Sequence, residues 1–158
     1  MEPTVIQIVT VGVLVFVLSQ IFLRWVIEPV RQLKKTMSDI LHAFLRYAYV
    51  MRYVDVIPPD LHSEAFEELR RFSDQLYTDM AMIPKCLFNY PFFGKILSLP
   101  EEEMVYKSAQ NLVATANWMN VKHENKLIHI ISNIQNACDN LGLYIDPNDR
   151  ITDKHLNV

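Results

Sequence analysis

The most marked pattern in the chain is a run of apolar residues near its start. Residues 5–23 contain no charged side chain, and Arg24 and Trp25 follow directly. Nineteen helical residues at 1.5 Å each reach about 28 Å, close to the thickness of a bilayer's hydrocarbon core. The pattern therefore predicts one membrane-spanning helix, and we assign residues 1–28 to a membrane anchor with a basic flank.

Charged residues are distributed unevenly around this run. Only Glu2 precedes it, whereas all 15 lysines and arginines follow it. Basic residues beside a span remain on the cytoplasmic side, so we expect the N-terminus outside and the rest of the chain in the cytosol. A cleaved signal peptide would need a basic segment before the apolar run, which is absent. Cys86 and Cys138 would then be reduced, and we expect both as buried small hydrophobes.

A heptad pattern begins after the anchor. Glu28–Pro29 predicts a break between two helices, although a kinked continuous helix also fits. Apolar residues then recur at alternating steps of four and three, which predicts a helix with one buried seam. The seam residues are Leu33, Met37, Ile40, Phe44, Tyr47, Met51 and Val54.

A second apolar stripe, Leu41, Leu45 and Ala48, runs beside the seam. Its added width favours a helix packed in a bundle, or one that contacts both its own domain and a partner. His42 lies near this apolar side, and we expect a core or boundary histidine.

Three further helices follow from the same kind of pattern. Prolines and a polar start place the first from Ser63 to about Ile83, and Pro100 is expected as the first residue of the second, which runs to Met119. The third is expected from Glu124 to Leu141, with Gly142 as its C-cap. The sequence thus predicts an all-α protein, in which one transmembrane helix precedes a cytosolic bundle of about four main helices over residues 29–145.

Two segments lack a clear period. Residues 85–99 are rich in Phe and Tyr, and we expect a loop or short helix that caps the core; an aromatic ligand wall or a membrane-surface contact are the alternatives. Residues 146–158 form a polar tail.

Composition and motifs narrow the function. Only 3 glycines are present and the net charge is −3, which argues against nucleotide-binding glycine loops and against a general DNA or RNA binder. No spacing typical of a catalytic triad, phosphate loop or zinc site occurs, so we expect neither an enzyme nor a metal site.

Cations and amides on the otherwise acidic helices are candidate phosphate ligands, because guanidinium and ammonium groups bind phosphate oxygens. An ordinary solvated surface, with ion pairs such as Glu67 with Arg71, is the alternative. Lys107 and Asn111 lie one turn apart, and several others crowd a helix–helix turn. The candidates are Arg70, Arg71, Lys107, Asn111, Asn117, Lys122, His123 and Lys126.

Three runs of sequence carry a resemblance to known proteins. They are Trp25-Val-Ile-Glu-Pro-Val-Arg-Gln-Leu-Lys-Lys, Asp39-Ile-Leu-His-Ala-Phe-Leu-Arg-Tyr-Ala-Tyr, and Glu68-Leu-Arg-Arg-Phe with the later Met82-Ile-Pro. With its size and single anchor, the chain resembles the membrane-bound accessory effector of type III CRISPR systems, within a wider group of bacterial one-span helical proteins.

The resemblance implies a specific function. Such effectors bind a cyclic oligoadenylate made during phage infection, assemble as oligomers and act at the bacterial inner membrane. Cyclic tetra-adenylate would be the activating ligand, with no other cofactor, and the lipid bilayer a partner. A ring of four adenylates suits the axis of a homotetramer, where each protomer contributes one copy of every cation. The alternative is a membrane-tethered scaffold that docks a partner protein through its heptad face.

Overall fold

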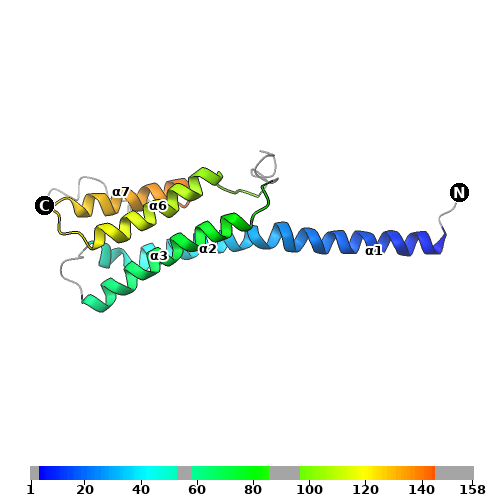
Figure 1. Ribbon diagram of the computed structural model, residues 1–158, viewed down its shortest axis with the longest axis horizontal. Coiled ribbons are helices and arrows are strands. Elements are labelled where there is room, and N and C mark those ends of the chain that lie inside the picture. The colour runs from blue at the N-terminus through cyan, green and yellow to red at the C-terminus, as the bar shows by residue number, and fades with distance from the viewer. Residues whose placement is uncertain (1–3, 53–57, 86–96, 145–158) are drawn as a thin grey trace.

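The structure is a computed structural model that describes residues 4–52, 58–85 and 97–144. In these ranges the chain is helical and contains no strand, which confirms the all-α fold class. A long helix projects from one end of a helical bundle (Figure 1). Within the described ranges the bundle consists of α2 (Glu28–Arg52), α3 (Pro59–Met82), α6 (Glu102–Met119) and α7 (Lys126–Leu141), in line with the four main helices predicted from the sequence.

The projecting helix is uninterrupted from the start of the apolar run into the bundle. It consists of α1 (Val5–Phe22), the π-helical turn η1 (Leu23–Ile27) and α2 (Glu28–Arg52). No residue of α1 is buried, and the helix is long and apolar enough to cross a membrane. Of the two alternatives at Glu28–Pro29, the structure therefore shows the continuous helix and not the break, and the boundary we placed at residue 28 lies inside this helix.

Pro29 explains why this helix contains a π-helical turn. A proline inside a helix has no N–H to donate, and its ring collides with the carbonyl group four residues earlier, here that of Trp25. In η1 the backbone hydrogen bonds span five residues and not four, and the N–H of Glu28 donates to the carbonyl of Leu23. The wider turn moves the obstructing carbonyl, so the helix continues past the proline.

The bundle is built from helices that pack antiparallel to their neighbours in the chain. Thr36, in the first half of α2, lies against Asp79, near the end of α3 (Pro59–Met82), so the two helices run in opposite directions. The Ser73 hydroxyl of α3 donates to the Ala109 carbonyl of α6 (Glu102–Met119) at 2.9 Å. Ser108 bonds in turn to the Ala137 carbonyl of α7 (Lys126–Leu141), and α7 returns to contact α2.

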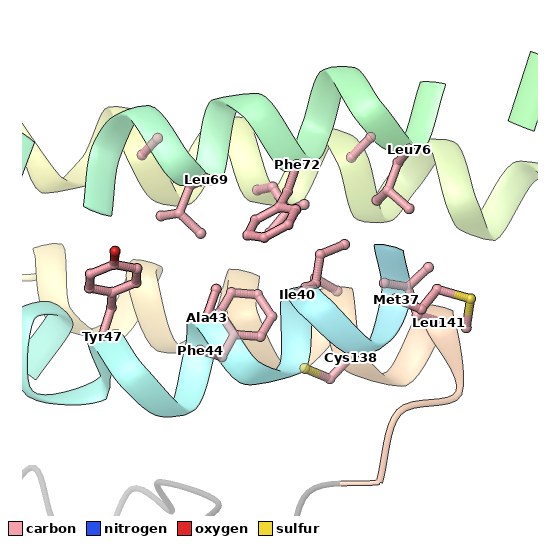
Figure 2. Close-up of a cluster of buried hydrophobic side chains, with 14 of the residues drawn as sticks. Met37, Ile40, Ala43, Phe44, Tyr47, Leu69, Phe72, Leu76, Cys138 and Leu141 are labelled. Carbon is pink, nitrogen blue, oxygen red and sulfur yellow. The ribbon is translucent and has the colours of Figure 1, made fainter. Parts of the chain in front are cut away.

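The heptad seam of α2 forms one side of the core, as predicted. Met37, Ile40 and Phe44 are buried with Leu69, Phe72 and Leu76 of α3, and Cys138 and Leu141 of α7 belong to the same cluster (Figure 2). The apolar residues of α6 from Val105 to Met119 also contribute to it. The expectation of a buried cysteine is thus confirmed for Cys138. Cys86 and Val54 lie outside the described residues, as does most of the aromatic segment 85–99 and the whole tail 146–158.

The second apolar stripe on α2 is not part of the core. Leu45 is 59% exposed, Ala48 is exposed, and Leu41 is only half-buried. The buried positions beside the seam lie on its other side, at Thr36, Ala43 and Val50, because α3 packs there. His42 is also exposed, so the prediction of a core or boundary histidine is wrong.

Three of the predicted helix starts need correction, the smallest being that of α7, which begins at Lys126 and not at Glu124. The helix α3 begins at Pro59 and not near Ser63, since proline fits the first helical position and Asp60 follows in the first turn. The helix α6 begins at Glu102 with Glu101 as N-cap, so Pro100 lies outside it. Gly142 ends α7 in the left-handed conformation, with φ of 66°, which confirms the predicted C-cap.

Candidate ligand site

The eight candidate ligand residues do not form one cluster. Arg70 and Arg71 lie in the middle of α3, Lys107 in the first half of α6 and Asn111 at its middle. The remaining four lie at or beyond the end of α6. Ten residues of helix separate Lys107 from Asn117, which corresponds to about 15 Å. Within one chain the sequence candidates therefore fall into separate groups.

The cations in the middle of the bundle have partners on their own helices. Arg71 pairs with Glu68 at 3.2 Å, so the expected pair with Glu67 is wrong, and its guanidinium lies over the Phe72 ring. The Arg70 guanidinium lies 5.4 Å from the centre of the Phe66 ring. These contacts are typical of a solvated helix surface.

Lys107 is engaged in the same way. Its ammonium lies 2.7 Å from the Glu103 carboxylate, one turn earlier, and this hydrogen bond lowers the pKa of Glu103 below its usual value. Asn111 is half-buried, and its backbone carbonyl accepts a hydrogen bond from Thr115. On the predicted shared face, the Lys107 ammonium is thus already paired, whereas the hydrogen bond at Asn111 involves its backbone and not its side-chain amide.

The α6–α7 turn brings three candidates together. Asn117, Lys122 and His123 are all exposed there, whereas Lys126 is only 9% exposed at the start of α7. The backbone N–H of Asn125 donates to Nδ1 of His123 at 3.1 Å, which fixes the imidazole beside the turn. These three side chains present an amide, an ammonium and an imidazole to solvent.

An aromatic pair that we did not anticipate lies at the same turn. The rings of Trp118 and His129 stack with centroids 4.1 Å apart and planes within 9°, and His123 meets the indole edge-on at 6.1 Å. His129 is exposed while Trp118 is half-buried, so one face of the imidazole is covered by indole. Because α6 and α7 are antiparallel, the last turn of α6 lies beside the first turn of α7, but which two rings meet depends on the register between the helices.

A further histidine closes the end of α6. Nε2 of His62 lies 3.1 Å from the carbonyl oxygen of Met119, the last residue of the helix. Because a carbonyl only accepts, the imidazole nitrogen donates, and it satisfies one of the carbonyls that every helix leaves free at its C-terminus. The contact fixes α3 against the end that carries the turn.

A second polar group joins α2 to α3. The Tyr47 hydroxyl, in a side chain only 1% exposed, lies 2.8 Å from Oε1 of Glu64 and 2.5 Å from Oε2 of Glu68. Burial and these carboxylates raise the pKa of Tyr47 well above its usual value. Arg46 pairs with Glu64, as Arg71 does with Glu68, so each carboxylate already has a cation. This network holds two helices together and is a poor candidate for ligand binding.

Neither metal chemistry nor a known relative defines the site further. Among the described residues, no group of three or more His, Cys, Asp or Glu side chains is arranged to hold a metal ion. Comparisons with protein-family models, curated proteins and solved structures return no match. The α6–α7 turn, with its cation, amide and stacked rings, is therefore the candidate ligand site on chemical grounds alone.

Proposed function

We propose that this chain is a single-span membrane effector whose cytosolic bundle binds a cyclic oligoadenylate. In this proposal the activating ligand is cyclic tetra-adenylate, the active form is a homo-oligomer, a tetramer being favoured, and the target is the bacterial inner membrane during antiviral defence. The observation that carries the proposal is the uninterrupted helix Val5–Met51, whose first half is apolar and exposed and whose second half is part of the bundle core.

A continuous helix of this kind suits signal transmission. A flexible linker would let the bundle bind a ligand without moving the span. Here α2 is held to α3 by Thr36 and Tyr47, and α1 continues the same helix. Any ligand that favours one packing of the bundles therefore also favours one arrangement of the spans.

The α6–α7 turn has the chemistry that such a ligand requires. Lys122 supplies a cation for a phosphate, and Asn117 an amide for a base edge. The outer face of His129 offers a stacking surface for adenine, at roughly 1–3 kcal/mol per base. Four symmetric copies would gather four lysines, which is how an acidic chain could bind a tetra-anion.

Titration of the full chain in lipid nanodiscs with cyclic tetra-adenylate tests this proposal. Trp25→Phe leaves Trp118 as the only tryptophan. We expect ligand to change the fluorescence of Trp118, and Lys122→Gln or His129→Ala to weaken binding about tenfold or more. Lys85→Gln, an exposed lysine outside the turn, is the matched control.

The outcomes separate the site from the function. The binding is also measured by calorimetry. If the ligand gives heat but Lys122→Gln and His129→Ala leave the affinity unchanged, the ligand is supported and this site is rejected. Neither heat nor a fluorescence change at micromolar ligand would reject the function itself.

A membrane-tethered scaffold is the second candidate. The heptad face, on which this alternative depended, is buried in the chain's own bundle. The surface left for a partner on α2 includes Leu45 and Tyr49, which are 59% and 64% exposed and lie one turn apart. Under this alternative, Leu45→Glu removes a stable partner in a pull-down that contains no nucleotide; under the effector proposal it does not.

A further inference from the structure

Two groups of cations differ in position within the described part of the chain, and Arg70, Lys85, Lys122 and Lys126 belong to neither. Those in ion pairs, Arg46, Arg71 and Lys107, belong to the body of the bundle. Four others follow the apolar helix within the next twelve residues, are all exposed, and form no ion pair with a described residue. We call these four the basic collar: Arg24, Arg31, Lys34 and Lys35.

The collar forms a compact basic surface. Arg31, Lys34 and Lys35 stand at positions i, i+3 and i+4 of α2, so they are neighbours on one side of the helix. Arg24 lies in η1, directly after the apolar run, next to the 69% exposed Trp25. Glu28 is the one acid between Arg24 and Lys35, which leaves the segment with a net charge of +3.

We propose that the basic collar binds the headgroups of anionic lipids. This inference rests on the membrane anchoring in the proposed function. It goes beyond that function by assigning a lipid class and the side chains that bind it.

The geometry brings the collar to the membrane surface. If the hydrocarbon ends at Leu23, Arg24 lies among the headgroups and Lys35 about 18 Å along the helix. The headgroup layer occupies about 6 Å of this distance. In a helix the Cα–Cβ bonds tilt toward the N-terminus, which for α2 is the membrane side. Long basic side chains can therefore reach back toward the membrane and place their charged groups near the headgroups. Their charges thus lie within about one Debye length, 8 Å, of the headgroups.

Like charges placed together without acidic partners are unfavourable unless something neutralises them. Three cations within one turn of α2 repel one another, and the exposed Glu28 makes no ion pair with a described residue. Anionic headgroups supply the missing charge, at about 1 kcal/mol per basic residue close to the surface. The orientation expected from the sequence places the collar at the cytoplasmic leaflet, where anionic lipids gather.

Quenching of Trp25 by brominated lipids tests this assignment. The full chain is reconstituted in phosphatidylcholine vesicles that contain 20 mol% of a lipid brominated near its headgroup. This brominated lipid is phosphatidylglycerol in one sample and phosphatidylcholine in the other. Trp118, in the bundle, gives a constant background. We expect brominated phosphatidylglycerol to quench Trp25 at least about twofold more strongly, with the preference disappearing in 0.5 M salt.

Variants then identify the residues responsible. Arg31→Gln/Lys34→Gln/Lys35→Gln should abolish the preference for phosphatidylglycerol, whereas Arg70→Gln/Lys85→Gln/Lys107→Gln removes the same charge elsewhere and should retain it. Equal quenching by both lipids in the unchanged protein overturns the collar proposal and leaves the anchor intact. No quenching by either lipid rejects the anchor itself. A preference that survives the collar variant overturns the assignment of these side chains.

Discussion

The Thr36 hydroxyl donates a hydrogen bond of 2.5 Å to the Asp79 carboxylate, and both side chains are buried between α2 and α3. Because α2 continues into the apolar helix, this bond links the projecting helix directly to the bundle. A buried carboxylate that loses a donor keeps its full desolvation cost, whereas removal of both polar groups can be nearly neutral.

We therefore expect Thr36→Val to destabilise the bundle by about 1–3 kcal/mol, and Thr36→Val/Asp79→Leu to restore part of the loss. Urea denaturation in detergent, followed by circular dichroism, measures both. Ser38→Ala, at an exposed position of the same helix, is the control. If the losses in the free energy of unfolding caused by Thr36→Val and Asp79→Leu simply add in the double variant, the hydrogen bond between them does not stabilise the bundle.

Alkaline pH should loosen the contact between Tyr47 and its two carboxylates. The pKa of Tyr47 is raised by burial and by hydrogen bonds to Glu68 and Glu64, and that of Tyr106 is raised by burial and Glu102. A raised folded-state pKa means that the folded protein holds the proton more tightly. This stabilisation is complete below about pH 10, the value for an unfolded tyrosine, and is lost as pH rises further.

Thermal unfolding between pH 8 and pH 11 measures this effect. We expect the unchanged protein to lose stability above about pH 10, and Tyr47→Phe to lose less because Tyr106 alone remains. At pH 8 the same substitution should cost about 1–2 kcal/mol, since two carboxylates lose their shared donor. Tyr144→Phe, at a 75% exposed tyrosine, should change neither result. A pH profile identical in Tyr47→Phe would contradict the assignment.

Pro29→Ala should remove the reason for the π-helical turn. With an N–H and no ring at position 29, η1 can become α-helical. A π-helical turn holds one residue more than an α-helical turn, and each helical residue corresponds to about 100° of rotation, so this change rotates α1 by about 100° relative to α2. Spin labels at Ser19 and Thr78, both exposed, report this rotation in a background with Cys86 and Cys138 replaced by alanine. We expect their separation to change by several ångströms.

Pro59→Ala is the matched control for this substitution. It removes a proline at the first position of α3, where proline obstructs no carbonyl, so the label separation should stay the same. An unchanged separation in Pro29→Ala would show that η1 does not depend on the proline.

The two described glycines should respond to alanine in opposite directions. Gly142 has φ of 66°, and an added Cβ would meet no atom within 4 Å, so Gly142→Ala carries only the backbone penalty of about 1–2 kcal/mol. Gly12 is helical and also has open space, so Gly12→Ala should favour the helix by about 0.5–1 kcal/mol. Helicity and thermal unfolding of both variants in detergent measure the difference. A loss of the same size at Gly12 would contradict a purely local cause.

The sequence predicted the fold class and the buried seam of α2, because helical periodicity is a local property. Leu33 to Met51 repeat at heptad spacing whatever surrounds them, and burial of one such face is the dominant stabilising term. The left-handed C-cap at Gly142 was equally local. The helix starts at Pro59 and Glu102 were missed because several neighbouring residues can serve as caps.

The candidate site was only partly predicted. Residue chemistry located Asn117, Lys122 and His123 at the α6–α7 turn, but it could not exclude Arg71 and Lys107, whose local ion pairs depend on rotamers. The stack of Trp118 on His129 needs two helices in a particular register, and periodicity in either helix alone does not contain that register.

The sequence alone therefore determined that the chain has one apolar helix long enough for a membrane, followed by a helical bundle with a defined inner face. Both properties follow from the order of apolar and polar residues along the chain. Only the structure decided that the apolar helix and α2 form one continuous helix, and that the stripe with Leu45 faces solvent. The reason is physical: η1 allows the helix to pass Pro29, and which side of α2 is covered depends on where α3 packs.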